Sequence, residues 1–442
     1  MIFSPLRIYM LIISLALGVN LGFPGSARAD LFDELDEETE PGAQTPQQEE
    51  DEFRKFVEQR DAEYNAYKEE LLKEFEAYKK IIQEERSKYQ SRLAKQWDDP
   101  VLSSQKVWVD YSTDLKRRGS VDFEKEIITI EIPVEAVDVS AVASEEVLRE
   151  ALTELVTKNK AEAFQEDVVA QAVEKRSKQE IQYLMTAEVK PKPILLSYLL
   201  GSAEVTIREV QAIVDYMLEN KQVITVTDTV GRSIQKVVVP LAAPVQVTPQ
   251  PVKDINSGMV GKLPTKAQAV FTHVDNYARR EQLEQALVFA IIETESAFNP
   301  MAKSAIPAYG LMQIVPKSAG LDVTKKLFGK EKILSSSYLY NSEQNIEVGA
   351  SYLNILYYQY LRKIENPESR LYCVIAAYNT GAGNVAKAFT GKRNLRTVIP
   401  LINQRQPAEV YEKLRLNLPY EETQKYLVKV NDRIKKYEAM GL

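Results

Sequence analysis

A carboxyl group at the end of an apolar segment is the group in this sequence best placed to carry out chemistry. Glu295 follows Ile291 by four residues, so a helix here directs the Glu295 side chain toward an apolar wall. Asn299-Pro300 must end this helix close by, because proline disfavours helix at the residue before it. Burial and the negative end of the helix dipole both disfavour an ionised carboxylate, so we expect a raised pKa and a proton available for donation near neutral pH. Glu293, two positions earlier, is expected to face solvent.

Three later segments place polar side chains beside apolar ones. Gly310-Leu311-Met312-Gln313 comes first, Ala377-Tyr378-Asn379 ends a nearly all-apolar helix, and Glu422-Thr423 with Tyr426 begins the last predicted helix. Each segment alone is a weak signal for a binding site. Their common order with Glu295-Ser296-Ala297-Phe298-Asn299-Pro300 is a much more specific signal.

Together these four segments resemble the lytic transglycosylase family, with its soluble-lytic-transglycosylase, goose-lysozyme-like catalytic domain, over about residues 264–438. The resemblance implies an enzyme that cleaves the β-1,4 bond between N-acetylmuramic acid and N-acetylglucosamine in peptidoglycan and leaves 1,6-anhydromuramoyl ends. It also implies that Glu295 acts alone as acid and base, whereas most glycosidases use two carboxylates. Pro307 departs from the family pattern, which usually has a glycine there.

The resemblance implies supporting roles for seven further residues and no cofactor. Gln313 and Tyr378 are expected to hydrogen-bond the sugar or its N-acetyl group, and Met312 to line the wall. Ser296 and Asn379 are expected to brace the site, while Glu422 and Tyr426 tie the last helix to the floor of the cleft. Tyr309 and some tyrosines between 352 and 360 could offer aromatic faces to saccharide, although most of them are expected in the core.

Two other functions remain open from the sequence. A lysozyme-type muramidase of the same fold would hydrolyse the same bond and release reducing ends. A non-catalytic murein-binding scaffold would recruit partners through a long helix, although the retained context of Glu295 disfavours it.

The sequence patterns of the segments that must position these residues predict a multidomain chain. Apolar residues recur at heptad-like spacings over 53–97, which indicates one long amphipathic helix. Its stripe packs against the next domain, or else provides self-association as a coiled coil or a contact for a protein partner. An α+β domain is expected over 98–240, with antiparallel strands near 107–111, 128–132, 223–227 and 237–239 and a helix capped by Ser144. A proline-containing linker over 241–263 then leads to an all-α, lysozyme-like catalytic domain over 264–442.

The first residues predict export. Arg7, an apolar stretch and Ala27-Arg28-Ala29 have the form of a signal peptide over 1–29, although retention as an anchor stays open. An acidic lead-in over 30–52, without Lys or Arg, is expected to be disordered. Because no cysteine follows the apolar stretch, we expect an exported, periplasmic protein that is not a lipoprotein.

Composition excludes other classes of function. The net charge of -7 and the isoelectric point near 5.3 disfavour a nucleic-acid partner. Cys373, the single cysteine, lies in an apolar run and is expected in the core, so no disulfide can form within the chain. His273, the single histidine, has no cysteine or histidine partner at ligand spacing, so no metal site is expected there. Peptidoglycan glycan strands are the expected ligand.

Overall fold

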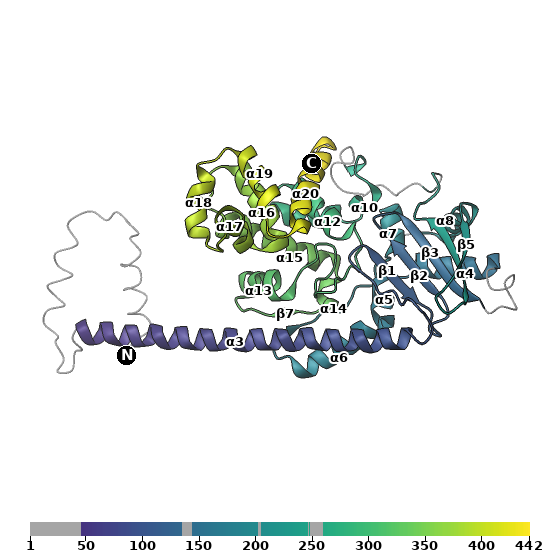
Figure 1. Cartoon of the computed structure of the whole chain (residues 1–442), viewed down its shortest axis with the longest axis horizontal. Helices are drawn as coiled ribbons and strands as arrows, with labels where there is room; N and C mark the ends of the chain where they lie inside the picture. The colour runs from purple at the N-terminus through teal and green to yellow at the C-terminus, as the bar shows by residue number, and fades with distance from the viewer. Residues whose placement is uncertain (1–45, 135–143, 202–204, 246, 248–259) are drawn as a thin grey trace, which may run out of the picture. The chain divides into compact units, whose positions relative to one another are not determined.

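The computed structural model describes residues 46–134, 144–201, 205–245, 247 and 260–442. These residues are mostly helical, with one five-stranded antiparallel sheet and a short two-stranded parallel pair (Figure 1). The chain divides into two units, Met1–Glu69 and Glu70–Leu442. The expected signal peptide over 1–29 and most of the acidic lead-in lie outside the described residues.

The first described element is the helix α3, Pro46–Leu93. It begins seven residues before the predicted start at 53 and ends at Leu93, before the predicted end at 97. Within the second unit the stripe of α3 is buried against the rest of that unit, at Leu71, Phe75, Tyr78, Ile81 and Leu93. From residue 70 onward the apolar stripe therefore packs within the chain, as the simpler of the two sequence interpretations expects.

The antiparallel sheet has the strand order β1-β2-β3-β6-β5. Its strands are β1 Val107–Tyr111, β2 Arg118–Asp122, β3 Ile127–Val134, β5 Gln222–Thr227 and β6 Ser233–Pro240. The four predicted strand segments all fall in this sheet, and their antiparallel pairing is confirmed. The sequence did not reveal β2, whose residues Arg-Gly-Ser-Val-Asp lack a run of apolar side chains.

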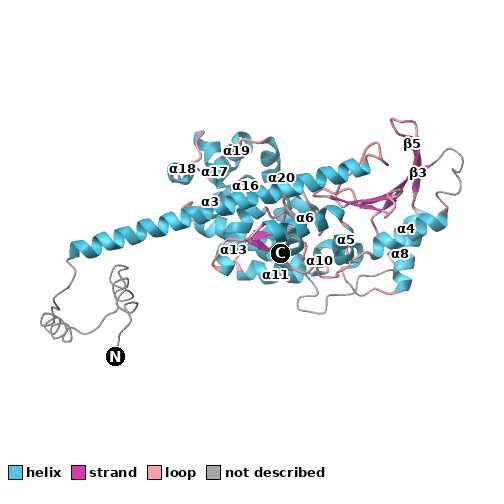
Figure 2. Ribbon diagram, turned by 90° about the horizontal axis from the view of Figure 1, so that it is seen from below, coloured by secondary structure: helices cyan, strands magenta, loops and turns pink. Residues whose placement is uncertain are grey.

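Two amphipathic helices, α4 Glu145–Thr157 and α8 Ile207–Glu219, lie on one side of this sheet (Figure 2). The predicted cap is confirmed, because the Ser144 side chain accepts a hydrogen bond from the backbone N–H of Val147. Leu152 of α4 and Ile213 of α8 are fully buried. The short helices α5 Lys160–Glu166, α6 Val168–Glu180 and α7 Leu195–Leu200 complete this region.

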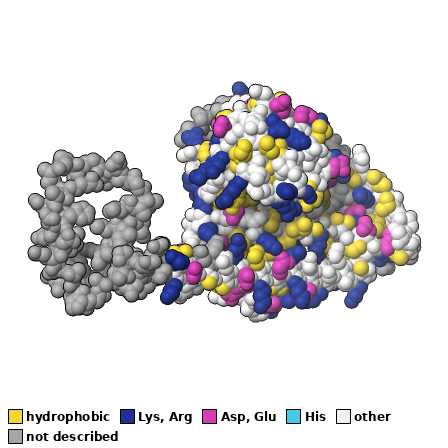
Figure 3. All heavy atoms as spheres, turned by 60° about the vertical axis from the view of Figure 1, so that its left-hand side comes forward, with side chains coloured by type: hydrophobic (Ala, Val, Ile, Leu, Met, Phe, Trp, Pro, Cys, Tyr) yellow, Lys and Arg dark blue, Asp and Glu magenta, His cyan; other side chains and the backbone are white. Residues whose placement is uncertain are grey.

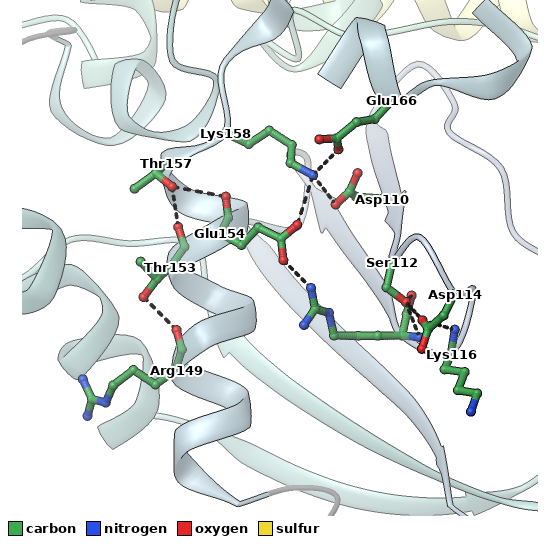
Figure 4. A network of polar contacts seen from close by, with 11 residues as sticks. Asp110, Ser112, Asp114, Lys116, Arg149, Thr153, Glu154, Thr157, Lys158 and Glu166 are labelled. Carbon is green, nitrogen blue, oxygen red and sulfur yellow. Dashed lines mark hydrogen bonds and ion pairs between the residues drawn. The ribbon is translucent and has the colours of Figure 1, made fainter. Parts of the chain in front are cut away.

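A buried lysine joins α4 to the sheet. The Nζ of Lys158 lies 2.9 Å from a carboxylate oxygen of Asp110 on β1 and 2.6 Å from one of Glu166 on α5, with Glu154 also within ion-pair range (Figure 4). Only 4% of the Lys158 side chain is exposed. Because a buried ammonium is costly unless it is paired, these carboxylates stabilise its position.

Between these two regions only part of the predicted linker is described. Leu241, Val247, Val260 and Leu263 are buried, so both ends of the segment 241–263 pack onto the fold. Residues 246 and 248–259 lie outside the described residues.

From residue 264 onward the described chain is almost entirely helical. Its helices are α10 Thr265–Gln268, α11 Phe271–Arg280, α12 Gln285–Ser296, η1 Pro316–Gly320, α13 Leu321–Phe328, α14 Ser336–Leu339, α15 Ser342–Ile355, η2 Leu356–Tyr360, α16 Pro367–Thr380, α17 Ala382–Thr390, α18 Leu395–Asn403, α19 Pro407–Asn417 and α20 Glu421–Ala439. The strands β4 Leu184–Met185 and β7 Ile333–Leu334 form the parallel pair. At the centre, α12 packs against α20, and α20 packs against α16. Cys373 is buried in α16, as predicted, and burial raises the pKa of its thiol.

Charges of both signs mix on the surface. On the face seen in Figure 3, Lys and Arg side chains lie among Asp and Glu side chains over most of the described surface.

Candidate active site

Glu295 lies in the last turn of α12, with its carboxyl buried. Ten of the twelve residues of this helix are buried, and Glu295 itself is 8% exposed. The helix ends at Ser296 because Ala297 and Phe298 both adopt left-handed backbone angles, with φ of 51° and 67°. Such angles are uncommon for residues other than glycine and turn the chain sharply. The predicted burial is confirmed, and the helix stops slightly before Asn299-Pro300.

The environment of Glu295 favours the protonated carboxyl. Burial is the largest influence and raises its pKa to about 7. The Tyr426 hydroxyl donates a hydrogen bond of 2.8 Å to Oε1 of Glu295 and lowers the pKa, while the charge of Glu422 raises it and that of Lys106 lowers it. The Glu295 carboxyl can therefore both hold and release its proton near neutral pH.

The prediction for Glu293 is wrong. Its side chain is 13% exposed and accepts two bonds from the Lys436 ammonium on α20, at 2.9 and 3.1 Å. Burial raises the pKa of Glu293, but the bonds from Lys436 and the positive charges of Lys436 and Arg433 outweigh that effect, so the pKa is lowered. Two carboxyls two positions apart on one helix thus have opposite character, because only one has a cationic partner.

The segment Gly310–Gln313 is fixed next to α12 by a buried asparagine on α15. Asn345 accepts from the Met312 N–H at 2.8 Å and donates to the carbonyls of Tyr309 and Leu339, at 2.8 and 2.9 Å. Gly310 has a φ of 73°, and a Cβ there would lie 2.5 Å from the Leu339 carbonyl oxygen. Only glycine fits this turn without displacing its neighbours.

Met312 and Tyr378 meet through the backbone. The Tyr378 hydroxyl on α16 donates a hydrogen bond of 2.8 Å to the Met312 carbonyl. The Met312 side chain is fully buried, and a Cβ on Gly349 of α15 would clash with its sulfur. The methionine side chain therefore fills the core beneath the segment, with none of its surface exposed.

Gln313 keeps one polar atom unused. It adopts a positive φ of 47°, and its amide nitrogen donates to the Gly310 carbonyl at 3.0 Å. Its Oε1 is buried without a hydrogen-bond partner among the described residues. A buried acceptor without a partner is uncommon and marks a place where a ligand can donate a hydrogen bond.

Of the remaining predicted residues, Ser296 and Asn379 form hydrogen bonds within the site, whereas Glu422 forms none there with a described residue. The Ser296 hydroxyl lies 3.1 and 2.8 Å from the carbonyl oxygens of Ile292 and Leu311, which share its single hydrogen, so its side chain contacts both α12 and the Gly310–Gln313 segment. Asn379 accepts a bond of 2.7 Å from the Thr423 hydroxyl, so Thr423 and Tyr426 fasten α20 to the site. Glu422 is exposed and acts on Glu295 only through its charge, so the expectation that it ties the helix down is wrong.

Two of the tyrosines expected to offer aromatic faces to a saccharide are buried. Tyr309 is buried and meets the Tyr340 ring edge-on, with 5.9 Å between ring centroids. Tyr352 is also buried, in contact with Tyr378. Tyr357 is half-buried, and Tyr358 and Tyr360 are exposed at 38% and 44%, so the expectation that most tyrosines between 352 and 360 lie in the core is wrong.

Two contributions to the site could not be inferred from the motifs. Lys106, just before β1, is near enough to Glu295 to influence its pKa, and the neighbouring Gln105 carbonyl accepts a bond of 3.2 Å from Asn299. These contacts join residues about 190 positions apart, and no local sequence pattern predicts them. Asn345 gave a weak signal as a polar residue beside the apolar periodicity of α15.

No group of three or more His, Cys, Asp and Glu side chains within the described ranges is arranged to hold a metal ion. His273 is half-buried, and burial lowers its pKa.

Comparison with known proteins agrees with the order of the four segments. Residues 273–398 match the family model described as "Transglycosylase SLT domain". The expected resemblance to lytic transglycosylases is therefore confirmed for this part of the chain. In particular, the chain is 44% identical over 175 residues to membrane-bound lytic murein transglycosylase C of Pectobacterium atrosepticum, covering 40% of this chain and 48% of the relative. It is 43% identical, with the same coverage, to the protein of that name from Serratia proteamaculans.

The extent of these similarities is limited. The chain spans about half the length of the curated relatives that it matches. The 70 kDa soluble lytic transglycosylase of Escherichia coli is 28% identical, with 42% of this chain and 28% of that chain covered and a TM-score of 0.30. A TM-score this low supports no structural argument.

The comparisons correct the expected localisation. Both relatives are named membrane-bound, which contradicts the prediction that the chain is not a lipoprotein. That prediction rested on the absence of a cysteine directly after the apolar stretch, and the stretch itself lies outside the described residues. In the part of the chain that the structure describes, no helix is both long and apolar enough to cross a membrane.

Proposed function

We propose that this protein is a lytic transglycosylase that cleaves the β-1,4 bond between N-acetylmuramic acid and N-acetylglucosamine in peptidoglycan. The observation that carries the proposal is the buried Glu295 carboxyl, with a pKa raised to about 7, in a region that matches the transglycosylase SLT domain. The names of the relatives support murein as the substrate. A carboxyl with this pKa can give up a proton and take one back near neutral pH.

The proposed reaction needs only one protein carboxyl. Protonated Glu295 gives its proton to the glycosidic oxygen, the bond from that oxygen to C1 of the muramoyl unit breaks, and N-acetylglucosamine leaves. The Glu295 carboxylate then takes the proton of the C6 hydroxyl as the C6 oxygen bonds to C1. A 1,6-anhydro ring results, water is neither consumed nor released, and Glu295 is again protonated. The substrate's own N-acetyl oxygen can stabilise the charge at C1, as in other substrate-assisted glycosidases.

The neighbouring groups support defined roles around Glu295. The unpartnered Oε1 of Gln313 is suited to accept a hydrogen bond from an N-acetyl N–H or a sugar hydroxyl. The Tyr378 hydroxyl, which donates to the Met312 carbonyl, keeps lone pairs free to accept another bond. Ser296, Asn379 and Thr423 would hold these groups in place before the substrate arrives, and preorganised groups of this kind stabilise a transition state without reorganisation.

Mass spectrometry of the products distinguishes this proposal from hydrolysis. Digestion of purified murein sacculi should release fragments with 1,6-anhydromuramoyl ends, which are lighter by one water than the reducing ends of a muramidase. Reducing ends as the main product would assign the protein to the hydrolytic alternative. Absence of any cleavage by the full chain would instead favour the scaffold.

Replacing Tyr426 with phenylalanine should change both the rate and its pH dependence. The Tyr426 bond lowers the pKa of Glu295, so Tyr426→Phe should raise that pKa and move the alkaline limb of kcat/KM to higher pH. Loss of the bond that orients the carboxyl should also reduce the maximal rate by about tenfold. The check is a pH series of initial rates, and an unshifted alkaline limb would show that Tyr426 does not act on the titrating group.

We also propose the domain organisation that the sequence predicts. An α+β domain over 98–240 and a lysozyme-like catalytic domain over 264–442 agree with the sheet and with the helical region that contains the family match. The part of α3 before residue 70 remains a candidate contact for a protein partner or for self-association, since Val57 is exposed. Truncation before residue 70 should leave murein cleavage intact if this part only recruits partners.

A further inference from the structure

We infer that a groove among α16, α19 and α20 is a second saccharide-binding site, which holds an N-acetylated sugar of a glycan strand outside the Glu295 cleft. This inference rests on the proposed function for the choice of ligand. The groove has a volume of about 450 Å³, within the range of small-molecule sites and large enough for a sugar ring. Its walls include Tyr372 of α16, Tyr411 of α19 and Asn431 of α20.

Two tyrosine rings form the apolar part of the groove. The centroids of Tyr372 and Tyr411 are 5.0 Å apart, with 58° between the ring planes. Both side chains are half-buried, so each ring is held by its neighbours while part of it stays accessible. The face of an aromatic ring is electron-rich, and the C–H bonds on one side of a pyranose ring present a weakly positive apolar surface to it. An angled pair of rings therefore suits a sugar better than a flat apolar ligand.

Polar groups around the rings match the hydroxyl and amide groups of such a sugar. The Tyr372 hydroxyl donates a bond of 2.6 Å to Glu368, which orients that carboxylate at the edge of the groove. The Asn431 carboxamide and the Lys435 ammonium also line the groove, and neither has a side-chain partner among the described residues. An amide with a free donor and a free acceptor can bond an N-acetyl group in both directions.

The groove lies on a different side of its helices from Glu295. On α20, Asn431 follows Tyr426 by five residues, which places it about 140° around the helix from the residue that contacts Glu295. On α16, Tyr372 precedes Tyr378 by six residues, or about 120° around that helix. A sugar in the groove thus does not compete with one in the cleft, and a long strand could occupy both sites at once. Two linked contacts on one polymer increase its apparent affinity without a change in the chemical step.

The test measures binding of the β-1,4-linked tetramer of N-acetylglucosamine by isothermal titration calorimetry. The full-length Glu295→Gln variant is used, so that cleavage cannot interfere. Two binding events are expected. Adding Tyr372→Ala and Tyr411→Ala should weaken one of them by at least about tenfold and leave the other unchanged. Tyr216→Ala, a half-buried tyrosine on α8 of the sheet region, is the matched control and should keep both events.

A second variant guards against misfolding of the double tyrosine variant. Asn431→Ala changes a side chain at the rim of the groove and should weaken the same binding event by about threefold to tenfold. In protein with an intact Glu295, the groove variants should sediment less with insoluble sacculi yet cleave short soluble murein fragments at the original rate. A single binding event in the Glu295→Gln protein, or two events unaffected by all groove variants, would overturn the inference. Neither result would bear on cleavage, which is measured separately with the unmodified chain.

Discussion

Glu295→Gln is expected to lower the rate of murein cleavage by at least about a thousandfold. Glutamine keeps the size of the side chain and can still accept the Tyr426 bond, but it can neither donate the proton to the leaving oxygen nor take one from the C6 hydroxyl. Since both proton transfers are assigned to one carboxyl, no other group of the site replaces it. Release of soluble fragments from purified sacculi provides the measurement.

Glu293→Gln is the matched control for this loss. It makes the same chemical change two residues earlier on α12, at a carboxylate that pairs with Lys436. Cleavage should persist within a few-fold, with some loss of thermal stability from the unpaired cation. Retention of more than about a tenth of the activity in Glu295→Gln would refute the single-carboxyl assignment.

The same substitution at Glu295 should stabilise the protein above neutral pH. The folded pKa of Glu295 is about 7, above its ordinary value of 4.5. Between these values the unfolded chain loses the proton while the folded chain keeps it, so rising pH favours unfolding by about 1.4 kcal/mol per pH unit. The full effect is roughly 3 kcal/mol once the pH exceeds the folded pKa. Glutamine cannot ionise, so the free energy of unfolding of the variant does not fall in this way as the pH rises.

Denaturant unfolding at two pH values measures this effect. At pH 8 the free energy of unfolding of Glu295→Gln should exceed that of the unmodified protein by roughly 3 kcal/mol, and near pH 4 the two should agree. Equal stability at both pH values would mean that the carboxyl is solvated and ionises normally. A catalytic group that lowers the stability of its own fold is a common consequence of placing a titratable side chain in an apolar site.

The burial of Glu295 could be predicted because the apolar residues that show its helical spacing are the same residues that surround its carboxyl in the structure. The apolar face of α12 is itself the wall around the carboxyl, so helical spacing alone reveals the burial. Strands near 107–111 and 128–132 could likewise be predicted from alternating apolar residues, and the second extends over Ile127–Val134 in the structure. β2 could not be predicted in this way, because its pairing with β1 and β3 rather than its own composition makes Arg118–Asp122 a strand.

The remaining features depend on contacts between distant segments. Glu293 was expected in solvent because it lies two positions from Glu295, on roughly the opposite side of the helix, yet the Lys436 ammonium of the last helix binds it. Met312 was expected to line the wall of the site, but its side chain packs in the core against Gly349. Thr423, rather than the charged Glu422 beside it, fastens α20, because only Thr423 turns inward toward Asn379. The direction of a side chain on a helix of unknown packing cannot be read from motif identity.

The pKa of Glu295 is the quantity on which the account depends most directly. NMR titration of protein labelled with ¹³C at the glutamate side-chain carboxyls, with the Glu295→Gln variant to identify the signal, measures it in the folded chain. A midpoint near 7 is expected. A midpoint near the ordinary value of 4.5 would show a carboxylate that has lost its proton at neutral pH and cannot begin the proposed reaction.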